Sequence, residues 1–118
     1  MFTKPQSIMN TEYIYSICNT IANQLGGRKF FETTGTKPMY VTSMKGAPTL
    51  AIDLPKTCEY QFFMVQYDEG WDTYTMKFFK NGRPEIIVDN VYCDQLQDIF
   101  EKHTKISCDQ CRVEWVMG

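Results

Sequence analysis

Residues 72–89 read DTYTMKFFKNGRPEIIVD, and this stretch decides the class of fold. Apolar and polar side chains alternate from residue 72 to residue 80, which is typical of a strand with one face in the core and one in water. Asn81-Gly82 follows, and this pair tolerates the positive φ angles of tight turns. The apolar run EIIVD comes next. The stretch therefore predicts a β-hairpin.

Short runs rich in β-branched and aromatic residues, separated by turn residues, continue this pattern between residues 28 and 90. In order they are KFFET, MYVTSM, TLAIDL, EYQFFMVQY, DTYTMKFF and EIIVD. The segments YDEGWD and KNGRP are typical of hairpin connections. We therefore expect an antiparallel meander of five or six strands.

A helix is expected before the strands. It begins at Asn10 or Thr11, either of which can cap it, and it ends at Gln24 or Leu25, because a Gly-Gly pair then supplies a stop. The apolar positions at helical spacing are Ile14, Ile17, Cys18, Ile21 and Leu25.

The outward face of this first helix carries no charge between Glu12 and Arg28. Its polar residues are Ser16, Asn19, Thr20, Asn23 and Gln24. A solvated helix face commonly carries Lys or Glu. Plain solvation and a surface covered by a partner are therefore both open interpretations.

A second helix should begin after Asp89 or Asn90 and continue to about residue 103. Its apolar side is marked by Tyr92, Leu96, Ile99 and His103, with Phe100 beside them. Asp94, Asp98 and Glu101 lie almost opposite. This acidic stripe fits a solvated outer face, because acids also favour a helix N-terminus, and it equally fits a contact surface for a basic partner.

The segment CRVEWVM, residues 111–117, alternates again and predicts a last strand at a sheet edge. The expected architecture is a single α+β domain over residues 1–118: a helix, a meander, a second helix and a short C-terminal strand. One helix at each end can cover one sheet face, which leaves the other face free or paired with a partner.

Composition is that of an ordinary globular protein, with 43% apolar and 22% charged residues in 118. The formal charge of −2 argues against a general affinity for nucleic acid. Residues 1–54 hold five Lys/Arg and three Asp/Glu, whereas residues 55–118 hold seven and eleven, so a basic partner would more naturally meet the second half. We expect a cytosolic protein without membrane contact, because neither a membrane span nor a signal peptide is visible.

The motif CDQC, residues 108–111, can serve several chemistries, and the five cysteines are expected as thiols or metal ligands in a reducing compartment. A structural zinc site needs four ligands, and the only nearby supplements to Cys108 and Cys111 are His103 and Cys58. A redox pair usually places its first Cys at a helix N-terminus after a strand, whereas here a helix precedes the pair. A turn with two ordinary thiols is the simplest interpretation, and we expect no cofactor.

Aromatic residues concentrate in two consecutive predicted strands and the turn between them. They are Tyr60, Phe62, Phe63, Tyr67, Trp71, Tyr74, Phe78 and Phe79. The segment QFFMV is apolar on both sides of its strand, and such a strand must be covered on both faces or offered to a partner. Base stacking on Phe63 or Trp71 is one use open to these rings, although few Lys/Arg residues accompany them.

Motifs of catalysis are missing from the sequence, which has no phosphate-binding glycine loop, no nucleophile elbow and no metalloprotease histidine pair. His103 falls on the apolar side of its helix, where histidine is more often packed than a general base. Asp68, Glu69 and Asp72 crowd one hairpin tip, which is more typical of a solvated turn than of a cation site. We therefore expect no enzymatic activity.

Four stretches resemble a pattern found in small accessory proteins of phages and prophages: NQLGGRKFFETTGTK, LAIDLP, DTYTMKF and VYCDQLQDIFEKHT. In that family a helix ending in Gly-Gly leads to a Phe and a Thr-Gly pair. An Asp-x-Tyr strand is followed by a Tyr-x-Asp-x-Leu helix. The family tends to finish that helix with Thr-Gly, where this chain has Thr104-Lys105. The resemblance covers about residues 14 to 106.

The resemblance implies a viral or mobile-element protein in the bacterial cytoplasm that inhibits or modulates a host complex, with host defence complexes as frequent targets. Two alternatives stay open, a single-stranded nucleic-acid-binding protein with an aromatic sheet face and a zinc-stabilised adaptor. The expected partner-binding residues are Asp94, Asp98 and Glu101 on the second helix, Asn19, Asn23 and Gln24 on the first, and Phe63 and Trp71 on the sheet.

Overall fold

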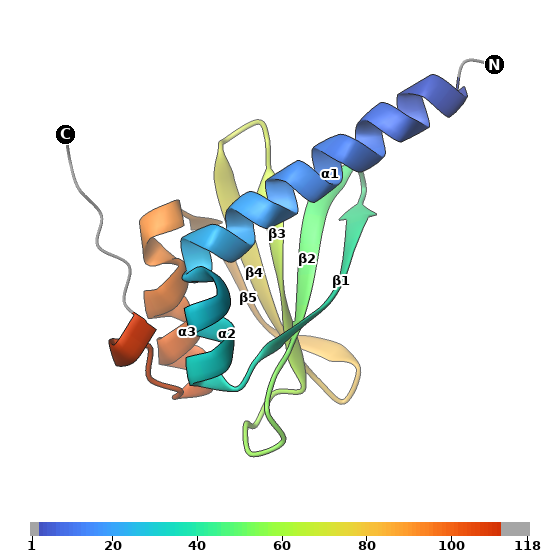
Figure 1. Cartoon of the computed structure of the whole chain (residues 1–118). Helices are drawn as coiled ribbons and strands as arrows, with labels where there is room; N and C mark the ends of the chain where they lie inside the picture. The colour runs from blue at the N-terminus through green and yellow to red at the C-terminus, as the bar shows by residue number, and fades with distance from the viewer. Residues whose placement is uncertain (1–2, 112–118) are drawn as a thin grey trace.

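A computed structural model describes residues 3–111 of the chain, with side chains from Thr11 onward. Helices α1 (Thr3–Leu25), α2 (Gly27–Thr34) and α3 (Leu96–Thr104) lie against one face of a curved five-stranded sheet (Figure 1). The predicted α+β class, with a helix before the sheet and another after it, is confirmed. The helix after Leu25 was not expected.

The strands are β1 (Lys37–Met44), β2 (Ala47–Asp53), β3 (Phe62–Asp68), β4 (Thr73–Lys80) and β5 (Arg83–Val91). They pair in sequence order and each pair is antiparallel, so the predicted meander is confirmed with five strands. Between β4 and β5 the φ angles of Asn81 and Gly82 are 54° and 77°. Two positive angles match the right-handed twist of the flanking strands, which is the reason this pair predicted the hairpin.

The segment KFFET, predicted as a strand, belongs to α2. Gly26 turns the chain after α1 with φ 128°, and a Cβ at this position would lie 2.9 Å from the Cβ of Phe30, so glycine is required. Phe30 and Thr34 are four residues apart and both are buried, and Gly35 ends the helix in the left-handed conformation. Two core residues in one short helix give too little periodicity to distinguish it from a strand.

The second predicted helix begins later than expected, because β5 extends to Val91 and a 3₁₀ turn, η1 (Cys93–Gln95), precedes α3. Tyr92, predicted on the core side, is 58% exposed, whereas Leu96 and Phe100 are fully buried. Asn90, at φ 58°, interrupts the register between β4 and β5. This interruption rotates Tyr92 out of the core.

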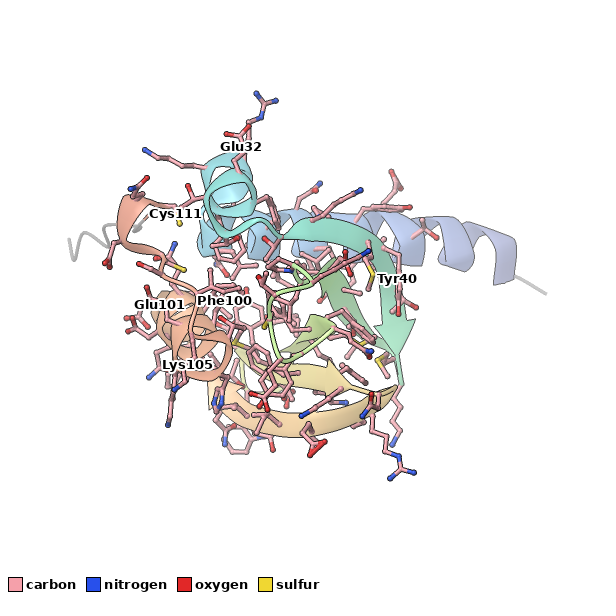
Figure 2. All side chains as sticks on the ribbon, turned by 90° about the horizontal axis from the view of Figure 1, so that it is seen from below. Glu32, Tyr40, Phe100, Glu101, Lys105 and Cys111 are labelled. Carbon is pink, nitrogen blue, oxygen red and sulfur yellow. The ribbon has the colours of Figure 1, made fainter. Side chains whose placement is uncertain are left out.

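The core lies between the helices and the sheet (Figure 2). Phe63 is central, since its ring centroid is 5.5 Å from that of Phe78 and 5.3 Å from that of Phe100. Phe100 in turn lies 5.0 Å from Phe30 of α2. Strands and helices therefore meet in a single aromatic cluster.

The chain after α3 forms a second 3₁₀ turn, η2 (Asp109–Cys111), beside α2. A final strand was predicted over residues 111–117. Cys111 belongs to η2, and residues 112–117 lie outside the described part of the chain.

Candidate interaction surfaces

The sheet face opposite the helices is called here the open face, since the described helices all lie on the other side. Its middle row crosses all five strands by direct cross-strand pairing. The row is Tyr40, Ala51, Met64, Lys77 and Ile87. Tyr40 is 48% and Ile87 54% exposed. Ala51 and Met64, between them, are buried, with 0% and 7% exposed. With strands about 4.8 Å apart, the row spans about 20 Å and offers apolar surface at its two ends.

A stacked aromatic pair adjoins this row. Phe62 and Phe79 face each other across β3 and β4, with ring centroids 4.4 Å apart and ring planes 9° from parallel. Both are only partly buried. The open face therefore exposes aromatic surface beyond the isolated apolar residues that are normal on soluble proteins.

Both edges of the sheet are unsuited to pairing with another strand. Pro38 lies in β1, whose register shifts between Pro38 and Tyr40, and Pro84 lies at the start of β5, whose pairing with β4 shifts twice. Proline cannot donate to a ladder, and bulges twist an edge strand away from a new partner. A partner is therefore expected to meet the face of the sheet and not its edge.

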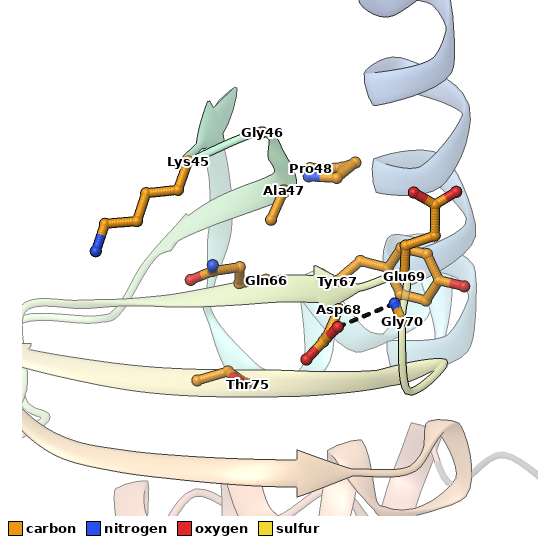
Figure 3. Close-up of a pocket in the computed structure, with 10 residues that line it drawn as sticks. All are labelled: Lys45, Gly46, Ala47, Pro48, Gln66, Tyr67, Asp68, Glu69, Gly70 and Thr75. Carbon is orange, nitrogen blue, oxygen red and sulfur yellow. Dashed lines mark hydrogen bonds between the residues drawn. The ribbon is translucent and has the colours of Figure 1, made fainter.

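A polar hollow of about 290 Å³ lies beside the open face, between the β1–β2 and β3–β4 turns (Figure 3). Gln66 and Thr75 line it from the sheet and Lys45 from the β1–β2 turn. The Oε1 of Gln66 is buried and has no hydrogen-bond partner among the described residues. A buried acceptor in this state favours any partner that brings a donor.

The sheet residues predicted to contact a partner separate into two kinds. Phe63 is fully buried, so its prediction as a surface stacking residue is wrong. Trp71 is 76% exposed at the β3–β4 turn, and its role in binding stays a prediction. Phe62 takes the outward position that sequence reasoning had given to Phe63. The apolar character of QFFMV on both sides was the signal, but it did not say which side was inside.

The residues of the predicted polar face of α1 also differ in their exposure. Asn19 and Asn23 are exposed. Gln24 is half-buried and accepts a hydrogen bond from the hydroxyl of Tyr74 on β4. Gln24 therefore attaches α1 to the sheet, while the two asparagines stay available to a partner.

The acidic stripe of α3 is not uniform. Asp94 and Asp98 are exposed, whereas Glu101 is half-buried and its carboxylate accepts a hydrogen bond from the backbone N–H of Cys108. A carboxylate bonded to a backbone amide fixes the chain that follows α3. We assign Glu101 to this structural role, which leaves Asp94 and Asp98 as surface residues.

The CDQC motif forms a turn packed against the helices. Cys108 is fully buried and Cys111 is 6% exposed. Gln97 of α3 donates to the carbonyls of Leu25 and Cys111, 2.7 and 2.9 Å away, which connects the end of α1 to this turn. Within the described residues no group of three or more His, Cys, Asp and Glu side chains is arranged to hold a metal ion. The four candidate zinc ligands, Cys58, His103, Cys108 and Cys111, are therefore not brought together.

Cys18 is a separate buried thiol, on the core side of α1. Burial raises the pKa of Cys18 to about 11, so the thiol stays protonated near neutral pH. A protonated buried thiol is neither a nucleophile nor a metal ligand. The sequence interpretation of Cys18 as a small core residue agrees with this position.

Comparison with protein-family models, with curated proteins and with solved structures gives no significant match for this chain. None of the helices in the described part of the chain has the length and apolar character needed to cross a membrane.

Proposed function

We propose that this chain is a non-enzymatic binding domain that contacts a partner protein through the open face. The observation that supports this most directly is the stacked pair of partly exposed rings, Phe62 and Phe79, together with the exposed side chains of Tyr40 and Ile87 at the two ends of the middle row. Exposed aromatic and aliphatic residues of this kind are typical of the centre of a protein interface.

Charge on the open face favours a protein over nucleic acid. Lys37 lies opposite Asp53 across the β1–β2 pair, and Asp89 accepts a hydrogen bond from Thr75 on the same face as Lys77. The charges of these two lysines and two aspartates cancel. A surface that tracks a phosphate backbone needs an excess of Lys and Arg.

The resemblance to phage accessory proteins supplies the expected class of partner, a host protein or complex in the bacterial cytoplasm that this chain would inhibit or modulate. Covering a functional surface of the partner requires no catalytic group. Single-stranded nucleic acid is the second candidate, because Tyr40, Phe62 and Phe79 offer faces on which bases could stack.

The test is capture of partners from bacterial lysate, with and without nuclease, followed by affinity measurement with the purified partner. We expect a protein partner that survives nuclease. Ile87→Lys, which places a charge at one end of the middle row, should weaken its binding at least about tenfold, or about 1.4 kcal/mol. Thr33→Lys, an exposed position on α2, is the matched control and should bind normally.

Three outcomes would contradict the proposal. Partner binding that Ile87→Lys leaves unchanged excludes the open face, and an effect of Asn23→Lys instead would locate the interface on α1. Loss of all binding after nuclease favours nucleic acid. A dimer in solution that Ile87→Lys converts to monomer would show that a second copy of the chain covers the face.

A further inference from the structure

A second surface lies at the end of the molecule where the β3–β4 turn meets the end of β5. Trp71 and Tyr92 are 76% and 58% exposed, more than any other large apolar or aromatic side chain in the described residues. They line one hollow of about 420 Å³ together with Thr73 and Asn90. We call this feature the aromatic hollow.

Local hydrogen bonds order the backbone on both sides of the aromatic hollow. Next to Trp71, Asp72 has φ 54° and its carboxylate accepts the hydroxyl proton of Tyr67 in a 2.7 Å hydrogen bond. Asp68 accepts the N–H of Gly70 within the same turn. On the other side, the N–H of Tyr92 donates to the side chain of Gln95. The backbone that carries the two aromatic side chains is therefore ordered before a ligand arrives, which lowers the entropy lost on binding.

Negative charge surrounds the aromatic hollow. The segments that build this end, residues 57–76 and 84–101, contain no Lys or Arg, and neither does α1 beyond residue 4. Exposed acids neighbour its lining residues along the chain or across the strands: Asp72 follows Trp71, Asp68 pairs with Thr73, Asp89 precedes Asn90, and Asp94 comes two residues after Tyr92. Tyr13 of α1 lies near Glu69 at this end. Burial, and then the Glu69 carboxylate, raise the pKa of the Tyr13 hydroxyl. The field here attracts cations and repels phosphate.

Two exposed aromatic side chains, at an end of the molecule that carries acids and no Lys or Arg, match the chemistry of a cationic side chain. Lys and Arg bind over the faces of Trp and Tyr through the ring quadrupole, and nearby acids complement their charge. We propose that this end binds a Lys- or Arg-rich peptide segment of a partner protein, with one cationic side chain in the aromatic hollow between Trp71 and Tyr92. This binding is separate from the open face and does not require the proposed function to be correct.

The test uses the full chain and a synthetic peptide of alternating Lys and Gly, with a Glu-for-Lys peptide as its counterpart. Affinity is measured by titration calorimetry, and the site is mapped by amide chemical shifts. We expect binding of the Lys peptide alone, weakening as salt is added, with shifts centred on residues 68–73 and 89–94. Trp71→Ala and Tyr92→Ala should each lower the affinity at least about fivefold, whereas Trp71→Phe should retain most of it.

Two matched controls separate a specific site from general attraction. Glu32→Gln removes an exposed acid from α2, at the outer side of the molecule in Figure 2, and Asp94→Asn removes one beside the aromatic hollow. Only Asp94→Asn should weaken the peptide complex. Tyr40→Ala on the open face should leave it unchanged, so failure here and failure of the proposed function are distinguishable.

Other results would overturn the inference. Shifts that lie away from the aromatic hollow, or equal losses in Glu32→Gln and Asp94→Asn, would reduce the interaction to unspecific charge attraction. Full affinity in Trp71→Ala would exclude the aromatic wall. If circular dichroism shows that Trp71→Ala is unfolded, the amide shift map of the unaltered protein decides whether the peptide binds at the aromatic hollow. Tighter binding of a single-stranded oligonucleotide at these residues would replace the peptide as ligand.

Discussion

Two pairs of adjacent phenylalanines show how the two faces of the sheet differ. Phe63 and Phe78 stack on the helix side with ring centroids 5.5 Å apart, while Phe62 and Phe79 stack on the open face at 4.4 Å. The inner rings are fully buried and the outer rings only partly. In both pairs a phenylalanine of β3 lies opposite a phenylalanine of β4. Only the covering helices differ: they bury one pair and leave the other partly exposed.

The first prediction compares the two members of one pair, Phe63→Ala and Phe62→Ala. Phe63 also contacts Phe100 of α3, so its removal opens a cavity between sheet and helices. We expect Phe63→Ala to lower the free energy of unfolding by about 3–5 kcal/mol. Phe62→Ala, at a partly solvated position, should cost about 1–2 kcal/mol, most of it the loss of stacking on Phe79. Urea denaturation followed by circular dichroism measures both.

Equal losses in the two variants would break the comparison, because they would mean that the open face is as fully packed as the core. The outer variant should instead show its main effect in the partner affinity described above.

The second prediction concerns the outer pair as a unit. A double-mutant cycle with Phe62→Ala and Phe79→Ala should give a coupling energy of about 0.5–1.5 kcal/mol in the stability of the free protein, as expected for an aromatic pair. The matched control is Phe62→Ala with Ile87→Ala, two strands away from each other, which should be additive. A coupling near zero for the Phe pair would show that the stacking does not contribute to stability.

The third prediction has the smallest effect and concerns the inner face. The ring of His103 lies 5.3 Å from that of Phe78. Burial, and then the charges of Lys102 and Lys105, lower the pKa of His103 below its ordinary value of 6.5. The unfolded chain therefore binds a proton more tightly than the folded one. The free energy of unfolding should fall as the pH drops through about 6.5 and level off below the folded pKa.

His103→Gln should remove this step, and the chain has no other histidine to replace it. Thermal unfolding of both proteins between pH 5 and 8 measures the difference. A step of the same size in the variant would assign it to another group. Phe62→Ala serves as the open-face control and should leave the pH dependence unchanged.

Local signals in the sequence predicted much of the fold. Asn81-Gly82 predicted the hairpin because few residues accept two positive φ angles, and alternation predicted β4 because the side-chain period of a strand is two. Gly26 marked the end of α1 because glycine readily adopts the positive φ angle that the chain has there. KFFET was assigned wrongly because a helix with only two buried residues has almost no pattern of its own.

The residues of the candidate site were harder to predict from the sequence. Trp71 and Asp94 were among the residues expected at a surface, and both are exposed. Tyr92 was expected in the core, because an interruption at Asn90 cannot be seen in a helical count. Glu101 was placed with the surface acids, and only the chain returning past α3 brings the Cys108 amide to it.

Local sequence was enough to predict the strands from β1 to β5 apart from their exact ends, the tight turn at Asn81-Gly82 and the apolar character of both sides of β3, although it misassigned KFFET. These properties depend on neighbours along the chain, so they can be read locally. The three-dimensional packing was needed to show that Phe63 faces the core and Phe62 the open face, and that Trp71 and Tyr92 share one hollow. Each of these depends on where α1, α2 and α3 pack and on the register of β5, which bring together residues distant in sequence. No local pattern distinguishes two neighbouring phenylalanines until the helices cover one of them.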